Sequence, residues 1–138
     1  DLRTAIERYL IGTSISLLDE SDFETMRDFI RKQKTAMETK DYDRFLELDE
    51  QFHVYCYHHY NNEYMINIIN NYRERFYSWR YQAIKITGRM EASIAEHERF
   101  LELISQNKTQ EACDLLEHHV GTAIRLAQSR MPVKYGTT

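Results

Sequence analysis

The sequence predicts an all-α fold, an antiparallel bundle of about six helices. Three observations predict it. Apolar residues recur every three or four positions along nearly the whole chain, which is the period of a helix with one buried face. Only four glycines and one proline, Pro132, occur in 138 residues, so little in the sequence interrupts helices. The connections between periodic segments are short, which places successive helices side by side and antiparallel.

Breaks in this periodicity place the helices at residues 2–18, 22–39, 42–60, 62–86, 89–106 and 109–130. Residues that can cap helix starts precede the later helices, namely a capping box over Ser21 to Glu24, then Asp41, Asn61 or Asn62, and Asn107 or Thr109. Gly88 ends the fourth helix. We expect one domain over residues 1–131 and a patternless tail over 132–138. The chain opens without Met, so we also expect a fragment.

The composition excludes several classes of protein. A net charge of −4 and a pI near 5.9 argue against a surface that binds nucleic acid, which needs clustered Lys and Arg. Cys56 and Cys113 lie inside predicted helices, so we expect two reduced core thiols in a cytoplasmic protein. No apolar run approaches the roughly 20 residues that cross a bilayer, and no signal peptide is visible. We therefore expect no membrane partner.

Four polar residues stand on the apolar faces of the predicted helices, where a side chain without a partner is costly. Asp49 and His53 lie one turn apart on the third helix, and His97 and His119 each interrupt an apolar row on the last two helices. One such histidine is more often a core residue hydrogen-bonded to a carbonyl or to Asp. For the whole set, metal ligation is the simplest common cause. We predict a divalent metal ion in the interior of the bundle, bound by Asp49, His53, His97 and His119.

The other three histidines differ from these four in position. His118 shares a polar row with Glu111 and Asp114, so we expect it to face water. His58 and His59 lie where the third helix should end, and a cation there suits the helix dipole. We interpret them as terminal residues rather than as ligands.

Arg73 and Arg80 border the apolar stripe of the fourth helix. An arginine in this position commonly lays its stem along the core and shows its head to water. Alternatively, a guanidinium at the mouth of a metal pocket binds a carboxylate bidentately. Most tyrosines are expected to pack, and one or two to line a polar pocket. The candidate ligand-binding residues for a small organic acid are Arg3, Arg73, Arg80 and Tyr57.

Several short motifs follow one another along nearly the whole chain: Arg3-x-x-Ile6-Glu7, Asp49-x-x-Phe52-His53, Asn62-x-Tyr64-Met65, Glu96-His97, Glu111-Ala112 and Leu116-x-x-His119-Val120. Their combination and order resemble the FCD domain, the C-terminal effector domain of FadR-type GntR transcription regulators. In metal-binding members of that family, the positions of the four predicted ligands bind a divalent ion, and a small carboxylate effector completes its coordination. The resemblance implies zinc, nickel or manganese; we expect zinc, with nickel, manganese or iron as alternatives.

The resemblance also implies partners. The family domain follows an N-terminal winged helix-turn-helix that binds operator DNA as a dimer, so we expect a homodimer that contacts DNA only through a missing N-terminal domain. The expected function is effector sensing by a bacterial transcription regulator. The identity of the acid is not implied, because family members respond to many different organic acids.

Two other functions remain open from the residues alone. A metalloenzyme needs an acid or base beside the ion, but the sequence has no HExxH motif, and Glu50, Glu96 and Glu98 should point about 100° away from the neighbouring ligands. We therefore expect no enzyme. A dimerisation module with a structural metal, or with none, is the other alternative, because structural zinc sites also use four protein ligands.

Overall fold

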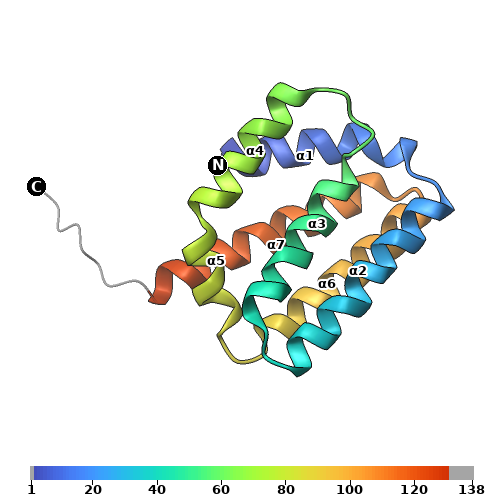
Figure 1. Cartoon of the computed structure of the whole chain (residues 1–138). Coiled ribbons are helices and arrows are strands. Elements are labelled where there is room, and N and C mark those ends of the chain that lie inside the picture. Colours follow the sequence, from blue (N-terminus) through green and yellow to red (C-terminus); the bar gives the residue numbers. More distant parts are fainter. Residues whose placement is uncertain (1, 131–138) are drawn as a thin grey trace, which may run out of the picture.

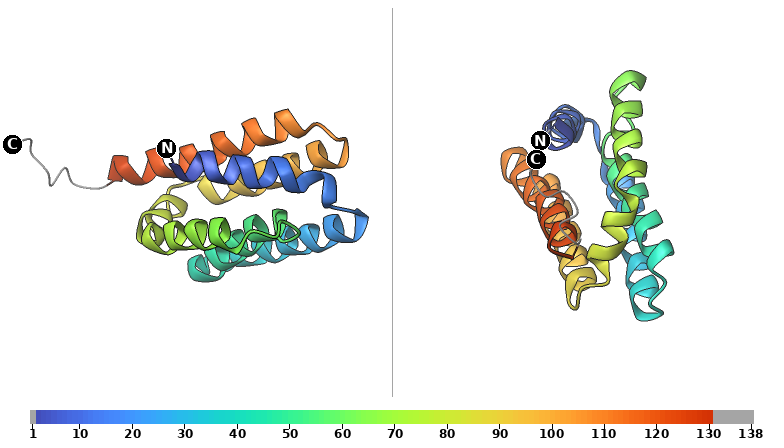
Figure 2. Two further views of the ribbon diagram at one scale, coloured as in Figure 1. Left: turned by 90° about the horizontal axis from the view of Figure 1, so that it is seen from above. Right: turned by 90° about the vertical axis from the view of Figure 1, so that its left-hand side faces the viewer.

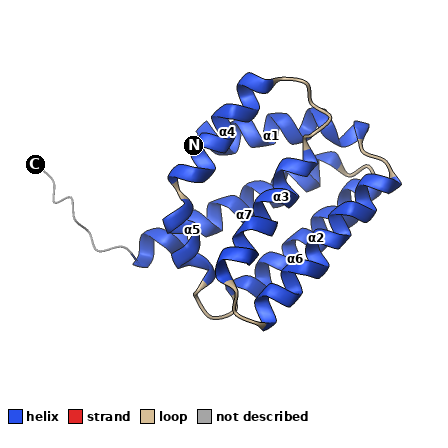
Figure 3. Cartoon of the chain, viewed as in Figure 1, coloured by secondary structure: helices blue, strands red, loops and turns tan. Residues whose placement is uncertain are grey.

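The computed structural model describes residues 2–130, and within that range it contains helices, turns and no strand (Figure 3). The elements are α1 (Leu2–Ser14), the 3-10 helix η1 (Ile15–Leu17), α2 (Glu20–Glu38), α3 (Tyr42–Cys56), α4 (Glu63–Arg75), α5 (Tyr77–Ile84), α6 (Arg89–Ser105) and α7 (Thr109–Arg130). The predicted all-α class is confirmed. The tail expected over 132–138 lies outside the described residues. None of the described helices is long and apolar enough to span a membrane.

The helices form two layers (Figures 1 and 2). In one layer α7 packs against both α1 and α6, and in the other α2 packs against α3. Across the gap between the layers α2 contacts α6, α1 contacts α4, and α5 contacts α7. Residues far apart in sequence, from α3 on one side and from α6 and α7 on the other, therefore face the same interior.

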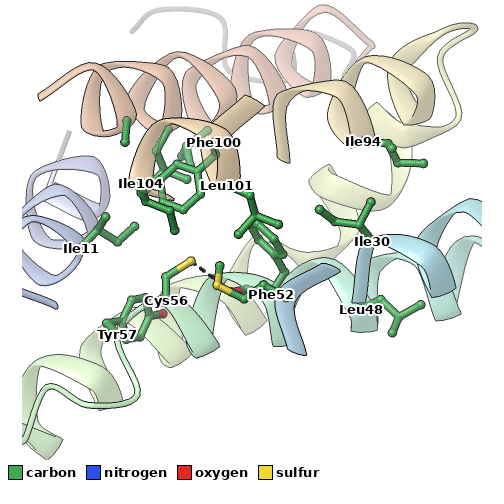
Figure 4. Packing of buried hydrophobic residues seen from close by; sticks show 14 of the residues in the cluster. Ile11, Ile30, Leu48, Phe52, Cys56, Tyr57, Ile94, Phe100, Leu101 and Ile104 are labelled. Carbon is green, nitrogen blue, oxygen red and sulfur yellow. Dashed lines mark hydrogen bonds between the residues drawn. The ribbon is translucent and has the colours of Figure 1, made fainter. Parts of the chain in front are cut away.

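An apolar core fills much of the space between the layers (Figure 4). Phe52 of α3 meets Phe100 of α6 edge to face, with ring centroids 6.1 Å apart. Cys56 and Cys113 are buried free thiols, as expected. Phe52 also stacks on His97 at 4.2 Å between ring centroids, so the apolar core continues directly into the polar cluster described below.

Two of the predicted capping residues act as predicted, and one prediction is wrong. Asp41 accepts a hydrogen bond from the backbone N–H of Arg44, and Asn62 accepts one from that of Met65. The capping box of α2 begins at Asp19 rather than at Ser21, because Asp19 and Asp22 each accept a hydrogen bond from the other's backbone N–H. Two aspartates therefore make the reciprocal side chain to backbone hydrogen bonds that we expected from Ser21 and Glu24.

The fourth predicted helix is two helices, so residues 2–130 contain seven α-helices instead of about six. The chain turns at Phe76, between α4 and α5, where φ is −102° and ψ is 14°. The predicted apolar stripe is only partly buried, whereas Arg73 and Arg80 beside it are 0% and 7% exposed. The face of α4 and α5 that packs inward is therefore the one that carries the arginines. Gly88 adopts a φ of 82° immediately before α6, a conformation that favours glycine.

The observed cap predicts the effect of two neighbouring substitutions. Asp19→Ala removes the acceptor for the Asp22 N–H, so we expect the free energy of unfolding to fall by about 1 kcal/mol. Ser21→Ala, the matched control, should leave it unchanged, because Ser21 lies within the first turn of α2. Urea denaturation measures both. Equal losses in the two variants would contradict this assignment of the cap.

Candidate metal centre

The four predicted ligands come together between the two layers. α3 contributes Asp49 and His53, α6 contributes His97, and α7 contributes His119. All four side chains are buried, and each offers one ligand atom within 4.8 Å of every other. Their assignment as ligands remains a prediction, but the convergence that it requires is present.

The spacing of the donor atoms is close to the one that a single ion would impose, with His119 slightly farther away. Asp49 Oδ1 lies 3.3 Å from Nε2 of His97, 3.5 Å from Nε2 of His53 and 3.8 Å from Nε2 of His119. The Nε2 atoms of His53 and His97 are 3.3 Å apart. A metal bound at about 2.1 Å separates adjacent ligands by roughly 3.0–3.4 Å. Three imidazoles and one carboxylate suit zinc, nickel, manganese and iron, so the residues fit the implied group.

Two of the three imidazoles are oriented by a hydrogen bond on their far side. His97 Nδ1 donates to Gln33 Oε1 at 2.9 Å, and His119 Nδ1 donates to the carboxylate of Glu96. These bonds place the proton on Nδ1 and leave the lone pair of Nε2 facing the centre. The Nδ1 of His53 is buried without such a partner among the described residues.

Sequence reasoning missed Gln33 and misplaced Glu96. Gln33 is fully buried on the inward row of α2 between Ile30 and Ala36. Helical spacing alone could therefore have identified it as a polar side chain on an apolar face. Glu96 is adjacent to His97 in sequence, so its side chain was expected to point about 100° away from that of His97 and away from the ion. It does point away from His97, but it contacts His119 on the neighbouring helix.

A buried arginine completes this contact. Arg89, the first residue of α6, donates to both carboxylate oxygens of Glu96 at 3.1 Å and 3.3 Å, and to the carbonyl of His119 at 3.4 Å. Burial acts to raise the pKa of Glu96, but the hydrogen bonds and charges of His119 and Arg89 outweigh it and lower that pKa to about 2. Glu96 is therefore an ionised carboxylate that positions His119.

Burial and charge act in different directions on the cluster itself. Desolvation lowers the pKa of His53 well below its ordinary value and also lowers that of His97, so burial favours the neutral form of both imidazoles. Desolvation opposes ionisation of Asp49 too, but the surrounding histidines hold its pKa well below the ordinary value. The pKa of His119 is raised despite burial, because His119 contacts the carboxylates of Asp49 and Glu96.

The second oxygen of Asp49 faces buried arginines. Oδ2 accepts a hydrogen bond from Arg80 Nη2 at 2.8 Å and lies 3.7 Å from Arg73 Nη2. Arg73 Nη1 in turn donates to Glu7 Oε1 at 2.9 Å, and Arg3 Nε lies 3.5 Å from Glu7 Oε2. The expectation that such arginines show their heads to water is wrong for Arg73 and Arg80. Buried carboxylates draw both guanidiniums inward, and sequence reasoning gave Glu7 no part in this.

A cavity of about 30 Å³ adjoins the cluster, lined on one side by Arg3, Asp49, His53, Arg80 and His119. It shares Arg3, Phe76, Trp79 and Ile124 with an outer pocket of about 330 Å³. Of the candidate ligand-binding residues, Arg3 and Arg80 line the inner cavity, whereas Arg73 and Tyr57 do not. Tyr57 is fully buried near Arg73 and Glu7, where burial raises the pKa of its phenol.

Comparison with known proteins places this arrangement in context. The sequence profile described as the FCD domain matches residues 1–122. A solved structure, described with the statement that Lar controls the expression of the Listeria monocytogenes agr system and mediates virulence, resembles the chain with a TM-score of 0.78 and 12% identity. The resemblance covers 94% of this chain but only 63% of that one, and at this identity it concerns the fold alone. No curated protein matches the sequence.

The buried charges predict a large effect of a single isosteric change. Glu7→Gln removes the carboxylate opposite Arg73 and leaves a guanidinium in the interior without its main counter-charge, so we expect the free energy of unfolding to fall by about 3 kcal/mol. Glu117→Gln, the control, removes one of the two exposed carboxylates that pair with Arg8 and should change the free energy of unfolding little. Chemical denaturation of both variants checks this. Similar stabilities for the two variants would contradict the account of the buried pair.

Proposed function

The chain belongs to the FCD domain family, and from that premise we propose that it is the effector-sensing domain of a bacterial GntR/FadR-type transcription regulator, extending over residues 1–131. The family match supports the resemblance that the sequence motifs indicated. The observation that carries the proposal is the convergence of four buried side chains of metal-ligand type beside a cavity that buried arginines also line.

The first part of the proposal concerns the metal. We propose that one divalent ion, zinc, or else nickel, manganese or iron, is held by Asp49, His53, His97 and His119. The spacing of the donor atoms and the hydrogen bonds from His97 and His119 to Gln33 and Glu96 support it. When bound, such an ion supplies a Lewis-acidic position for an oxygen ligand. Asp49, His53 and His119 line the inner cavity, so an oxygen ligand would reach the ion from there.

The second part concerns an organic acid. The buried side chain of Arg80 lines the inner cavity beside Asp49. Its Nη1 is buried without a hydrogen-bond partner among the described residues. A guanidinium with a donor left over favours an anion. The inner cavity of about 30 Å³ has room for about two water molecules, which is enough for a carboxylate group.

The outer pocket indicates what the rest of the acid is like. Its lining is mainly apolar and aromatic, with Leu2, Tyr72, Phe76, Trp79 and Ile124 beside Arg3 and Gln128. A carboxylate in the inner cavity would place its remaining atoms in this pocket, because the two spaces share four lining residues. We therefore propose an acid with an aromatic or branched aliphatic part rather than a polyhydroxylated one.

The third part concerns the response. An acid that takes hydrogen bonds from Arg80 competes with Asp49, and so changes the contact between α5 and α3. A difference of a few kcal/mol in affinity between two packings is enough to shift their populations. We propose that this shift reorients winged helix-turn-helix domains on a cytoplasmic homodimer, which contacts operator DNA through them, and that the domain itself is not an enzyme.

Thermal unfolding of the zinc-loaded chain tests the proposal. We expect benzoate or 3-methylbutanoate to raise the unfolding temperature by several degrees at saturating concentration, because a ligand that binds only the folded state stabilises it. Arg80→Met should lose this shift, whereas Arg125→Met, which removes an exposed arginine, should keep it. If no carboxylic acid stabilises a chain shown to carry metal, acid sensing is contradicted. If only gluconate or citrate does so, the apolar class of acid is wrong.

A second variant pair tests the orientation of the ligands. Glu96→Gln removes the charged acceptor of His119 Nδ1, and we expect zinc affinity to fall about 10- to 100-fold. Glu98→Gln changes an exposed glutamate on the same helix that pairs with Lys34, and zinc affinity should stay the same. Competition with a zinc chelator dye measures both. Unchanged zinc binding in Glu96→Gln would contradict the role given to Glu96.

A further inference from the structure

A second group of ligand-type side chains lies where α2 begins and α3 ends. Asp22, in the first turn of α2, faces His58 and His59, which follow the last residue of α3. His59 Nε2 lies 3.1 Å from Asp22 Oδ2, and His58 Nε2 lies 3.6 Å from Asp22 Oδ1. One ligand atom from each lies within 4.8 Å of the other two. None of these residues belongs to the buried cluster, and from sequence both histidines were expected only to end a helix.

The tautomer of His58 leaves an unfavourable contact in the absence of a cation. Its Nδ1 lies 2.6 Å from the carbonyl oxygen of Tyr55, and because a carbonyl can only accept, Nδ1 must carry a proton. In the neutral ring, Nε2 is then an unprotonated acceptor. It faces Asp22 Oδ1, another acceptor, so two lone-pair atoms oppose each other across 3.6 Å. A metal ion between them, or a proton on Nε2, would remove the repulsion.

Two hydrogen bonds hold the carboxylate of Asp22 in place. It is only 6% exposed, its Oδ1 accepts a hydrogen bond from the Tyr55 hydroxyl at 2.9 Å, and its Oδ2 accepts one from the Asp19 N–H at 2.9 Å. Burial opposes its ionisation, but these hydrogen bonds and His59 lower its pKa, so the side chain is a carboxylate. A carboxylate has about four acceptor positions, so Oδ1, which accepts only from Tyr55, keeps one for a further partner, while Oδ2 also contacts His59 Nε2 at 3.1 Å.

Each histidine presents its Nε2 atom to the carboxylate of Asp22. The rings of His58 and His59 lie against each other with centroids 3.8 Å apart, and their side chains are 33% and 39% exposed. Two imidazoles and one carboxylate are a common donor set for zinc, and solvent can occupy its remaining position. We propose that Asp22, His58 and His59 bind a second divalent metal ion, zinc, at the surface of the domain.

Such an ion would join two elements at the edge of the bundle. It would tie the start of α2 to the turn after α3, the helix that carries Asp49 and His53. His59, in the turn after α3, already contacts Asp22 of α2, and Tyr55 at the end of α3 donates a hydrogen bond to the same carboxylate. This second site rests on residues that the proposed sensing site does not use, so each can stand without the other.

Calorimetric titration of the chelator-treated chain with zinc chloride tests the proposal. We expect two equivalents of zinc in the wild type. The double variant His58→Ala/His59→Ala should bind one, and the single variant His58→Ala should bind the second equivalent at least about tenfold more weakly. His118→Ala, which removes an exposed histidine on α7, is the matched control and should still bind two. Circular dichroism confirms that each variant is folded.

His119→Ala separates this proposal from the proposed function. It should lose the buried site and keep one equivalent, which the further change of His58 and His59 to alanine abolishes. If the wild type and His119→Ala each bind one equivalent that depends on His58 and His59, the surface site stands and the buried centre fails. A wild type that binds only one equivalent, lost in His119→Ala, overturns the surface site. So does a second equivalent that survives in the double variant.

Discussion

The buried carboxylate of Asp49 is the charge on which the interior of this domain depends. One of its oxygens faces three imidazoles and the other accepts a hydrogen bond from Arg80. A carboxylate inside a protein is tolerated only when charges and donors surround it. Helices α3, α5, α6 and α7 must therefore meet at this point, which fixes how the two layers pack on each other.

The polar cluster and the apolar core form one continuous interior. Phe52 stacks on the ring of His97, while Gln33 orients the imidazole of His97 and the pair of Glu96 and Arg89 orients that of His119. Binding at the cluster would therefore change the packing of α2, α6 and α7 together, since densely packed side chains transmit small displacements. This coupling is the physical basis on which a sensing domain can report an occupied site to other parts of a protein.

The sequence was sufficient to find the residues of the cluster but not their surroundings. Asp49, His53, His97 and His119 stand out because the helical period assigns each to an apolar face. The same period describes one helix at a time, so it does not reveal which helices meet. Glu7 and Arg73, which lie 66 positions apart, could not be paired in this way. The turn at Phe76 also went undetected, because neither glycine nor proline marks it.

Crystallography of the zinc-loaded domain, with anomalous diffraction measured at the zinc edge, tests the central claim most directly. The account predicts an anomalous peak between Asp49 Oδ1 and the three Nε2 atoms, about 2.1 Å from each. Imidazoles of His53, His97 and His119 that turn away from one another, with no anomalous density between them, would contradict it.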